Sequence, residues 1–470
     1  MFIKCKEINK DYFLNHPVLI KHISLLEKLK NLYSPEDDIV FIKAPGRVNL
    51  IGEHTDYNMG PVLPCAIDKE IVFCIRKNSM AEIFATNVNP NFKDIRFSLI
   101  RPIKPYSAGH WGNYIKAGIK GIIDHLQSQN QGFTGYDIIV SGTLPSAAGL
   151  SSSSALVVAA AFSFVVMNGI NLEKHEIAEI CAKAEHFVGT AGGGMDQAAS
   201  LLGQKDTFLK MEFNPLRIQT IQAPAGIRLV LFHSLIEAEK SGKVREEYNR
   251  RVLECRIGVD LFNNFMKDRY KKDYNPVDFI GEVRPERLNL DQDEFSRLIL
   301  NFLDQLPDTH HTRQIVSFLN LAESELSQRH HSILRGKPLT EPRGGFKIKG
   351  RFRHVFTECQ RVEHMADCLS KADLSEVGAL LNASHKSLSE DYEVSTPEVD
   401  DLVRILLENG ATGARLMGAG FGGMVLAFLG TDNLVDLVKK VDVHYYSRFT
   451  AVDSVKCVFP CVVADGAGVI

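Results

Sequence analysis

One stretch of the sequence places a loop of small residues between a short strand and a long apolar helix. Residues 136–141 alternate in a way that predicts a strand, with Tyr136, Ile138 and Val140 on one face. Residues 145–154, the small-residue loop, contain only Pro, Ser, Ala, Gly and Leu, and the chain after Ala155 is almost wholly apolar. The sequence therefore predicts a strand, a loop and a buried helix in immediate succession.

The start of this helix is suited to bind a phosphate group. The first N–H groups of a helix lack internal partners and carry a partial positive charge, and small residues let an anion reach them. Ser151 to Ser154 add hydroxyls that can cap the helix, bind phosphate oxygens or ligate magnesium. A serine-rich cap on a core helix is the alternative, but four consecutive serines exceed what one cap requires. The common P-loop ends in Gly-Lys-Ser/Thr, which is missing here, so the cation must come from elsewhere.

Length and charge narrow the class of protein. A chain of 470 residues should form two domains, or three, and its net charge of −3 does not suggest nucleic acid as a partner. The nine cysteines show no paired spacing, which favours a cytosolic protein with reduced thiols and disfavours a structural zinc. The N-terminus has no apolar signal core, and a membrane span in the apolar helix is improbable beside a phosphate-type loop.

A second block, which we call the polar segment (residues 47–58), mixes charged groups with apolar residues and glycine. Its polar side chains include Arg47, Asn49, Glu53, His54 and Asp56. A core strand would not tolerate so many charges without partners, and a solvated loop would not need the apolar residues between them. Convergent polar groups on a partly buried segment suit a polyol, because each hydroxyl needs a donor and an acceptor. A salt-bridged turn is the weaker alternative.

Two glycine-rich stretches complete the candidate site. Three glycines at 192–194 precede Asp196, and they let the backbone pass close to a ligand, which favours a catalytic carboxylate over a mere partner of the helix dipole. Residues 413–428 predict two strands around a glycine turn (residues 418–423), which would form a second wall around a ligand.

The remaining pattern predicts several further elements. We expect a strand over 38–44 that stops at Pro45 and Gly46, two strands over 62–67 and 70–76, and long helices over 173–188 and 244–267. Residues 268–350 are polar and irregular. The clusters His310–His311 and His330–His331 within them are interpreted as solvated surface rather than metal ligands.

Three of these blocks resemble one family. Gly46-Arg-Val-Asn-Leu-Ile-Gly-Glu-His-Thr-Asp-Tyr-Asn resembles the galactokinase signature. Leu144-Pro-x3-Gly-Leu-Ser-Ser-Ser-Ser-Ala and Gly418-Ala-Gly-Phe-Gly-Gly resemble motifs of the wider superfamily of galacto-, homoserine, mevalonate and phosphomevalonate kinases. Gly193-Gly-Met-Asp-Gln, residues 353–355 and residues 382–395 also match. The resemblance covers about residues 38–465 and is poor near 268–350.

The resemblance implies a two-domain α/β (α+β) small-molecule kinase fold with the active site between the domains. The N-terminal domain, residues 1–215, would be ribosomal-S5-like and bind sugar and ATP. The C-terminal domain, residues 216–470, would be ferredoxin-like with a helical insertion near 268–350.

The resemblance also assigns roles to individual residues. Asp196 would lie beside the anomeric hydroxyl with Arg47 nearby, and Ser153 and Glu185 would hold Mg²⁺. Asp196 would act as a base or by positioning, and Arg47 would keep it ionised or act on the transferring phosphoryl group. The sugar contacts would be Glu53, His54, Asp56 and Tyr248. The ATP-binding residues would be Pro145, Ser146, Gly149, Leu150, Ser151, Ser152, Ser153 and Ser154.

The implied activity is ATP-dependent phosphorylation of D-galactose at C1, which yields galactose 1-phosphate and ADP in a cytoplasmic monomer. N-acetylgalactosamine and L-arabinose are alternative substrates, the former because Gly189-Thr-Ala-Gly-Gly-Gly resembles the N-acetylgalactosamine-kinase and fungal branches. Galacturonate is disfavoured because its carboxylate would face Glu53. A non-catalytic galactose and ATP sensor is the alternative from another class, although the intact serine loop and Asp196 favour catalysis.

Overall fold

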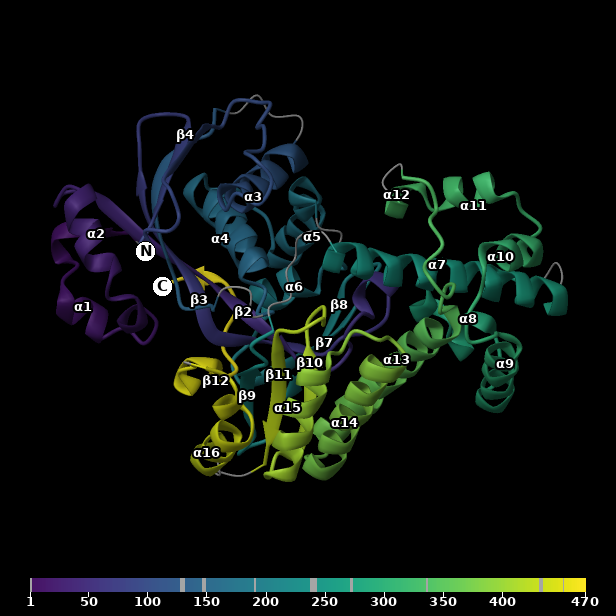
Figure 1. Cartoon of the computed structure of the whole chain (residues 1–470). Helices are drawn as coiled ribbons and strands as arrows, with labels where there is room; N and C mark the ends of the chain where they lie inside the picture. Colours follow the sequence, from purple (N-terminus) through teal and green to yellow (C-terminus); the bar gives the residue numbers. More distant parts are fainter. Residues whose placement is uncertain are drawn as a thin grey trace.

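A computed structural model of the chain describes residues 2–126, 132–145, 149–189, 192–236, 243–270, 274–334, 337–430, 434–450 and 452–470. Two β-sheets are covered by helices, and a helical arm projects to one side (Figure 1). Within the described ranges, none of the helices combines the length and the apolarity that a bilayer crossing requires.

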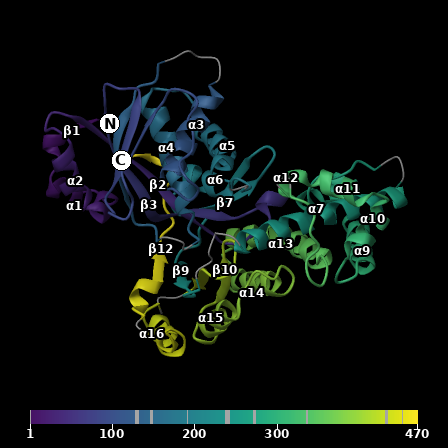
Figure 2. The same cartoon turned by 45° about the horizontal axis from the view of Figure 1, so that its top comes forward.

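The first sheet has seven strands in the order β1-β2-β3-β6-β4-β5, with β13 also paired to β2. Its strands are β1 (Ile3–Lys4), β2 (Asp38–Asn49), β3 (Pro64–Lys77), β4 (Glu82–Asn87), β5 (Ile95–Ser98), β6 (Tyr136–Gly142) and β13 (Gly468–Val469). β4 and β6 run parallel, while the other neighbouring strands run antiparallel. The first and last strands both pair with β2, so the two ends of the chain lie close together in both views (Figures 1 and 2).

Two strand predictions are wrong. β2 does not stop at Pro45 and Gly46 but continues to Asn49, with a shift in register against β3 between Pro45 and Arg47. A bulge of this kind absorbs residues that break regular pairing and re-aims the following side chain. The two strands expected over 62–67 and 70–76 form the single strand β3.

Helices cover both faces of the first sheet. One face carries α3 (Gly112–His125), α4 (Ser152–Met167), α5 (Lys174–Ala184) and α6 (Met195–Leu202). The other carries α1 (Lys10–Leu14) and α2 (Leu25–Leu32). α3 and α4 approach closely because residue 118 is a glycine: a Cβ there would lie 2.3 Å from the carbonyl oxygen of Val157. The predicted buried helix, α4, is therefore surrounded by α3, α5, α6 and the first sheet.

The second sheet lies below the first in Figure 1, in the order β10-β11-β9-β12. Its strands are β9 (Arg228–His233), β10 (Gly413–Met417), β11 (Met424–Leu429) and β12 (Val458–Cys461). A separate two-stranded hairpin consists of β7 (Thr207–Glu212) and β8 (Arg217–Gln222). Its helices are α13 (Ile348–Ser370), α14 (Leu374–Glu390), α15 (Pro397–Glu408) and α16 (Leu434–His444). One core joins the two sheets, since Val48 and Leu50 pack with Leu426 and Phe428. The domain division at residue 215 stays a prediction.

The arm consists of the outer part of α7 (Lys243–Tyr270) with five shorter helices (Figure 2). These are α8 (Pro285–Leu288), α9 (Gln292–Gln305), α10 (Thr312–Leu319), α11 (Glu323–Arg329) and α12 (His331–Leu334). The expectation that all four arm histidines are solvated is wrong, because His310 and His330 are each 6% exposed. His330 Nε2 lies 3.1 Å from a carboxylate oxygen of Asp260 on α7, so its burial is balanced by a polar partner.

Candidate functional site

Arg47 joins the small-residue loop to Asp196. Its Nε donates to Asp196 Oδ1 at 2.8 Å, and its Nη1 donates to the carbonyl oxygen of Gly149 at 2.6 Å. Ser151 Oγ donates to the other carboxylate oxygen of Asp196 at 2.5 Å. Three segments that are far apart in sequence thus meet at one carboxylate, as the sequence predicted for Arg47 and Asp196.

Local structure explains why these groups converge. The bulge in β2 turns the buried Arg47 toward α4 and α6. Ser151 is the N-cap of α4 and lies in the left-handed region with φ +57°, while Asp196 is the second residue of α6. A carboxylate has about four lone-pair positions, so two accepted hydrogen bonds leave Asp196 able to accept another. The carboxylate is 28% exposed and can therefore meet a ligand.

The small-residue loop presents only part of its residues outward. Ser146 lies outside the described residues. Ser152 and Ser153 are partly exposed in the first turn of α4, where the helix offers N–H groups. Leu150 is buried in the core between the sheets, and the hydroxyl of Ser154 accepts a 3.5 Å hydrogen bond from Gln197. Side chains from the two middle serines therefore have the freest access to a ligand.

Glu53 is held by the glycine turn. Its Oε1 accepts hydrogen bonds from the Gly418 N–H at 2.9 Å and from Nη2 of Arg415 at 3.1 Å. Gly418 has φ +83°, a conformation that glycine adopts without strain. The predicted second wall thus touches the polar segment directly. The sequence prediction had assigned Glu53 only to a ligand, whereas one of its oxygens also has a structural partner.

Asp56 is bound by the triple-glycine stretch. Its Oδ2 accepts a hydrogen bond from the Gly193 N–H at 3.1 Å. A Cβ at residue 193 would lie 2.5 Å from the carbonyl carbon of Asp56, so only glycine fits this contact. Burial raises the pKa of Asp56 to about 6, and the negative charge of Asp196 adds to the shift. The two carboxylates therefore share one electrostatic environment.

Aromatic rings close the site beside His54. The ring centroid of His54 lies 5.8 Å from that of Tyr248 and 4.7 Å from that of Tyr392. Burial lowers the pKa of His54 well below its ordinary value, so the imidazole is neutral at physiological pH. The structure therefore brings together His54 and Tyr248, two residues that the resemblance assigns to the sugar.

Two buried residues that the sequence analysis did not identify bind the backbone of the polar segment. Arg415 is fully buried, and it donates to the carbonyl oxygens of Leu50 at 2.7 Å and Asn49 at 2.5 Å. Glu358 on α13 accepts from the Gly52 N–H at 3.0 Å. Burial opposes ionisation of Glu358, but nearby positive charges, chiefly that of Arg361, hold its pKa at about 2. Arg415 lies in the strand predicted before the glycine turn, whereas no local sequence pattern points to Glu358.

The predicted magnesium ligands are hard oxygen donors on neighbouring helices. Ser153 lies in the first turn of α4, and Glu185 is a buried carboxylate at the end of α5, which packs against α4. Among the described residues, no three His, Cys, Asp or Glu side chains gather into a metal-holding group. Magnesium keeps several waters and takes one or two carboxylates together with phosphates. The donor set thus fits an ion that arrives with a phosphate-bearing ligand.

Comparison with known sequences identifies three regions. The galactokinase galactose-binding signature matches residues 27–77, the GHMP kinases N terminal domain matches residues 113–204, and the GHMP kinases C terminal domain matches residues 365–442. A curated galactokinase of Dictyostelium discoideum is 30% identical over 468 residues, which cover 93% of this chain and 90% of that protein.

Comparison with solved structures gives the same fold. The Lactococcus lactis galactokinase complexed with galactose matches with a TM-score of 0.73 at 24% identity and covers 95% of this chain and 99% of its own. The L. major mevalonate kinase in complex with R-mevalonate has a TM-score of 0.52 at 18% identity, over 90% and 95% of the two chains. The predicted two-part α/β kinase fold is therefore confirmed.

The raised pKa of Asp56 predicts how stability depends on pH. Because the folded protein holds this proton more tightly than the unfolded chain, the contribution of Asp56 to stability falls as pH rises from about 4 to about 6. Asp56→Asn removes the ionisable group, so the variant does not lose this stability as pH rises. The free energy of unfolding of the variant minus that of wild type should therefore be about 1–3 kcal/mol larger at pH 7 than at pH 4. Denaturant unfolding at both pH values measures this.

Asp401→Asn provides a control of opposite sign. Burial opposes ionisation there, but hydrogen bonds from Arg404 and Arg448 outweigh it and lower the pKa of Asp401. Its replacement should therefore cost stability at both pH values, and this cost should shrink only as pH falls below the ordinary pKa of 3.8. A stability difference between Asp56→Asn and wild type that stays constant with pH would contradict the assignment.

Proposed function

The chain belongs to the galactokinase family and is a sugar kinase, and on that premise we propose that it transfers the γ-phosphoryl group of ATP to the C1 hydroxyl of D-galactose. The products are galactose 1-phosphate and ADP. The observation that carries the proposal is the junction of Arg47, Asp196 and the small-residue loop, because it brings a carboxylate to within one hydrogen bond of a loop of phosphate-binding type. Phosphoryl transfer depends mainly on positioning and charge neutralisation.

Asp196 is proposed to receive the proton of the C1 hydroxyl as the oxygen attacks the γ-phosphorus. Both of its oxygens already accept a hydrogen bond, from Arg47 and Ser151. These bonds fix the orientation of the carboxylate, so positioning and proton acceptance contribute together. The guanidinium of Arg47, which bonds both Asp196 and the small-residue loop, would stabilise negative charge on the phosphoryl group.

We propose that the sugar is bound by side chains of the polar segment and of α7. These side chains are two carboxylates that can accept hydrogen bonds, a neutral imidazole and a phenol: Glu53, Asp56, His54 and Tyr248. Asp56 and His54 are assigned to the axial 4-hydroxyl. L-arabinose shares this hydroxyl arrangement and N-acetylgalactosamine differs at C2, so both stay alternative substrates, whereas a galacturonate carboxylate would oppose Glu53.

ATP is proposed to place its phosphates at residues 145–154, with Ser153 and Glu185 holding Mg²⁺. When bound, the ion neutralises phosphate charge during transfer. The N–H groups of the first turn of α4 and the partly exposed Ser152 and Ser153 hydroxyls supply the protein's own contacts to the phosphate oxygens.

The setting of the enzyme is also a proposal. All nine cysteines are free thiols, which supports a cytoplasmic location. We propose that the protein works as a monomer on small-molecule substrates alone, without nucleic acid or membrane partners.

Galactose should be the best substrate in a coupled kinase assay over galactose, N-acetylgalactosamine, L-arabinose and glucose. Glucose carries an equatorial 4-hydroxyl that would leave Asp56 and His54 without a partner, and such mismatches cost ~10⁴-fold or more in kcat/KM. Comparable turnover of glucose would show that the assignment of Asp56 and His54 is wrong.

Asp196→Ala should lower kcat by ~10²–10⁴-fold while galactose binding, measured by calorimetry, persists. Ser151→Ala is the matched control, because it removes one hydrogen bond to the carboxylate and leaves the carboxylate itself. Its loss of kcat should be clearly smaller. Near wild-type kcat in Asp196→Ala would rule out the proposed role.

Glu185→Gln should lower kcat far more than galactose affinity, and a magnesium titration should recover part of the loss. Glutamine keeps the shape and removes the charge that suits a hard cation. Glu179→Gln, on the exposed face of the same helix, should leave the titration unchanged. Unchanged magnesium dependence in Glu185→Gln would exclude it as a ligand, and a wild-type protein that binds galactose and ATP without turnover would favour the sensor.

A further inference from the structure

A turn of the arm packs directly against the backbone that follows the polar segment. This 3₁₀ turn, η6 (Ile280–Glu282), lies between α7 and α8, and its residues Ile280 and Gly281 are buried. A Cβ at residue 281 would lie 2.4 Å from the nitrogen of Gly60 and 2.4 Å from the carbonyl carbon of Met59. Glycine is therefore the residue that lets these two backbones touch.

The backbone that η6 touches is hydrogen-bonded to the turn that carries Asp56. The Met59 N–H donates to the Asp56 carbonyl oxygen at 3.1 Å. The Gly60 N–H donates to the carbonyl oxygen of Thr55 at 2.8 Å. Asp56 begins the 3₁₀ turn η3 (Asp56–Asn58), and Met59 ends it in the left-handed region with φ +56°. A displacement of Met59 or Gly60 is therefore passed on to the backbone of Asp56.

Arg256 of α7 joins the arm to the same turn by hydrogen bonds. Its Nη1 donates to the carbonyl oxygen of Asp278 at 2.8 Å, and its Nη2 donates to the carbonyl oxygen of Tyr57 at 3.4 Å. Its Cζ lies 3.7 Å from the ring centroid of Phe279. Because a guanidinium is a planar fork with fixed donor directions, Arg256 sets how far this part of the arm lies from the polar segment.

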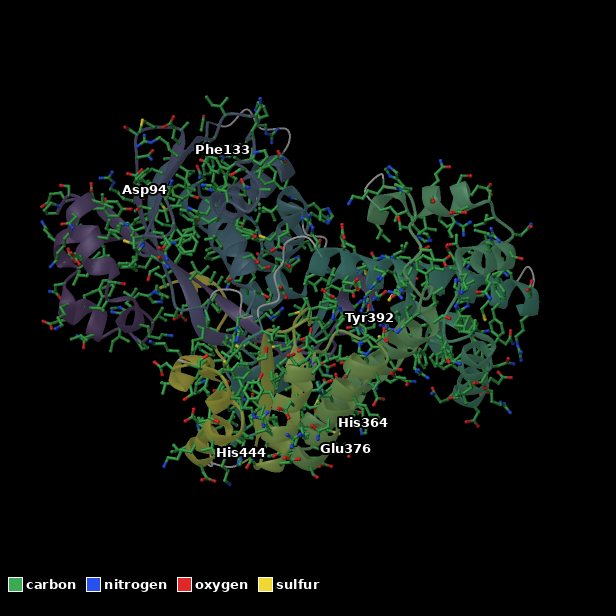
Figure 3. All side chains as sticks on the ribbon, in the orientation of Figure 1. Asp94, Phe133, His364, Glu376, Tyr392 and His444 are labelled. Carbon is green, nitrogen blue, oxygen red and sulfur yellow. The ribbon has the colours of Figure 1, made fainter. Side chains whose placement is uncertain are left out.

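The contact lies where the arm joins the sheets. The Tyr57 hydroxyl lies 2.8 Å from that of Tyr392, which is in the middle of the molecule at the base of the arm (Figure 3). Arg284 fixes η6 to a further element, since its Nε donates to the Gly281 carbonyl oxygen at 2.8 Å and its Nη1 bonds Glu212 on β7 at 3.3 Å. The turn η6 is thus bound to α7, to β7 and to the end of the polar segment.

We propose that Gly281 and Arg256 are positioning residues through which the arm sets the affinity for galactose. They hold the turn that carries Asp56, whose carboxylate is a proposed sugar contact, so the inference rests on the proposed function. The small-residue loop is held instead by Arg47 and Asp196. The arm should therefore affect galactose binding and leave ATP binding unchanged.

Gly281→Ala tests the backbone contact. Its methyl group would overlap the Gly60 nitrogen and the Met59 carbonyl group, so the turn that carries Asp56 must shift. Galactose affinity, measured by calorimetry, should fall by about 10–100-fold, the effect of one hydrogen bond to a charged group. Affinity for ATP, measured without galactose, should stay unchanged. Gly468→Ala is the matched control, because a Cβ there would meet no atom of the described residues within 4 Å, and it should alter neither affinity.

Arg256→Met tests the same link without a steric clash, so it answers the question even if Gly281→Ala does not fold. Methionine keeps an unbranched apolar stem and removes both hydrogen bonds of the guanidinium. Galactose affinity should fall by about 2–10-fold, the effect of neutral hydrogen bonds to carbonyl groups, while ATP affinity stays unchanged. Arg287→Met is the control within the arm, because it removes an arginine bond to the Pro276 carbonyl oxygen and should leave both affinities unchanged.

The wild-type protein provides a readout that needs no variant. If the arm contacts favour the arrangement that binds galactose, galactose must in turn stabilise these contacts. Saturating galactose should therefore slow amide hydrogen exchange in residues 278–283. Exchange in α10 and α11 of the arm should not change.

The possible outcomes separate this inference from the proposed function. Unchanged galactose affinity in both Gly281→Ala and Arg256→Met, equal losses of galactose and ATP affinity, or unchanged exchange in residues 278–283 would overturn the inference alone. Wild-type protein that binds galactose without phosphorylating it would refute the kinase reaction and leave the role of the arm standing. Wild-type protein that binds no galactose would refute both.

Discussion

The buried guanidinium of Arg415 is the interaction on which the geometry of the site depends. It is fully buried in β10 of the second sheet, yet its partners lie at the end of β2 of the first sheet (Asn49) and shortly after it (Leu50 and Glu53). Removing one partner of a buried charge costs about 3–5 kcal/mol, so the two sheets are strongly coupled at this point. The polar segment is consequently held from the second sheet while it faces the loops of the first. The side chains of this segment can then be held against the small-residue loop and the glycines before Asp196.

The site combines rigid backbone partners with a small number of ionised groups. Asp56 is bound to a glycine amide, Glu53 to another, and Arg47 to the carbonyl of Gly149. Glycines at these points let main chain replace side chains as partners, which leaves carboxylate lone pairs for a ligand. Such preorganised dipoles need no rearrangement when charge develops, which suits a reaction governed by electrostatics.

Local sequence signals predicted the parts of the site that are built from local structure. The small-residue loop before an apolar helix, the glycines before Asp196 and the mixed polar segment all have short-range patterns with a direct physical meaning. What was missed depends on distant partners. Glu53 meets Arg415 across 362 positions, and the strand through Pro45 continues because β3 pairs on both sides of a bulge. His310 and His330 were misplaced because the polar helices of the arm hide a core formed by residues such as Phe262 and Phe302.

β1 and β13 cover one edge of the first sheet. Ile39 of β2 pairs with Ile3 of β1, and Ile42 of β2 pairs with Val469 of β13. A strand edge without a partner is a template for pairing with another chain. These two short strands therefore occupy parts of β2 that would otherwise be free to pair with a second molecule.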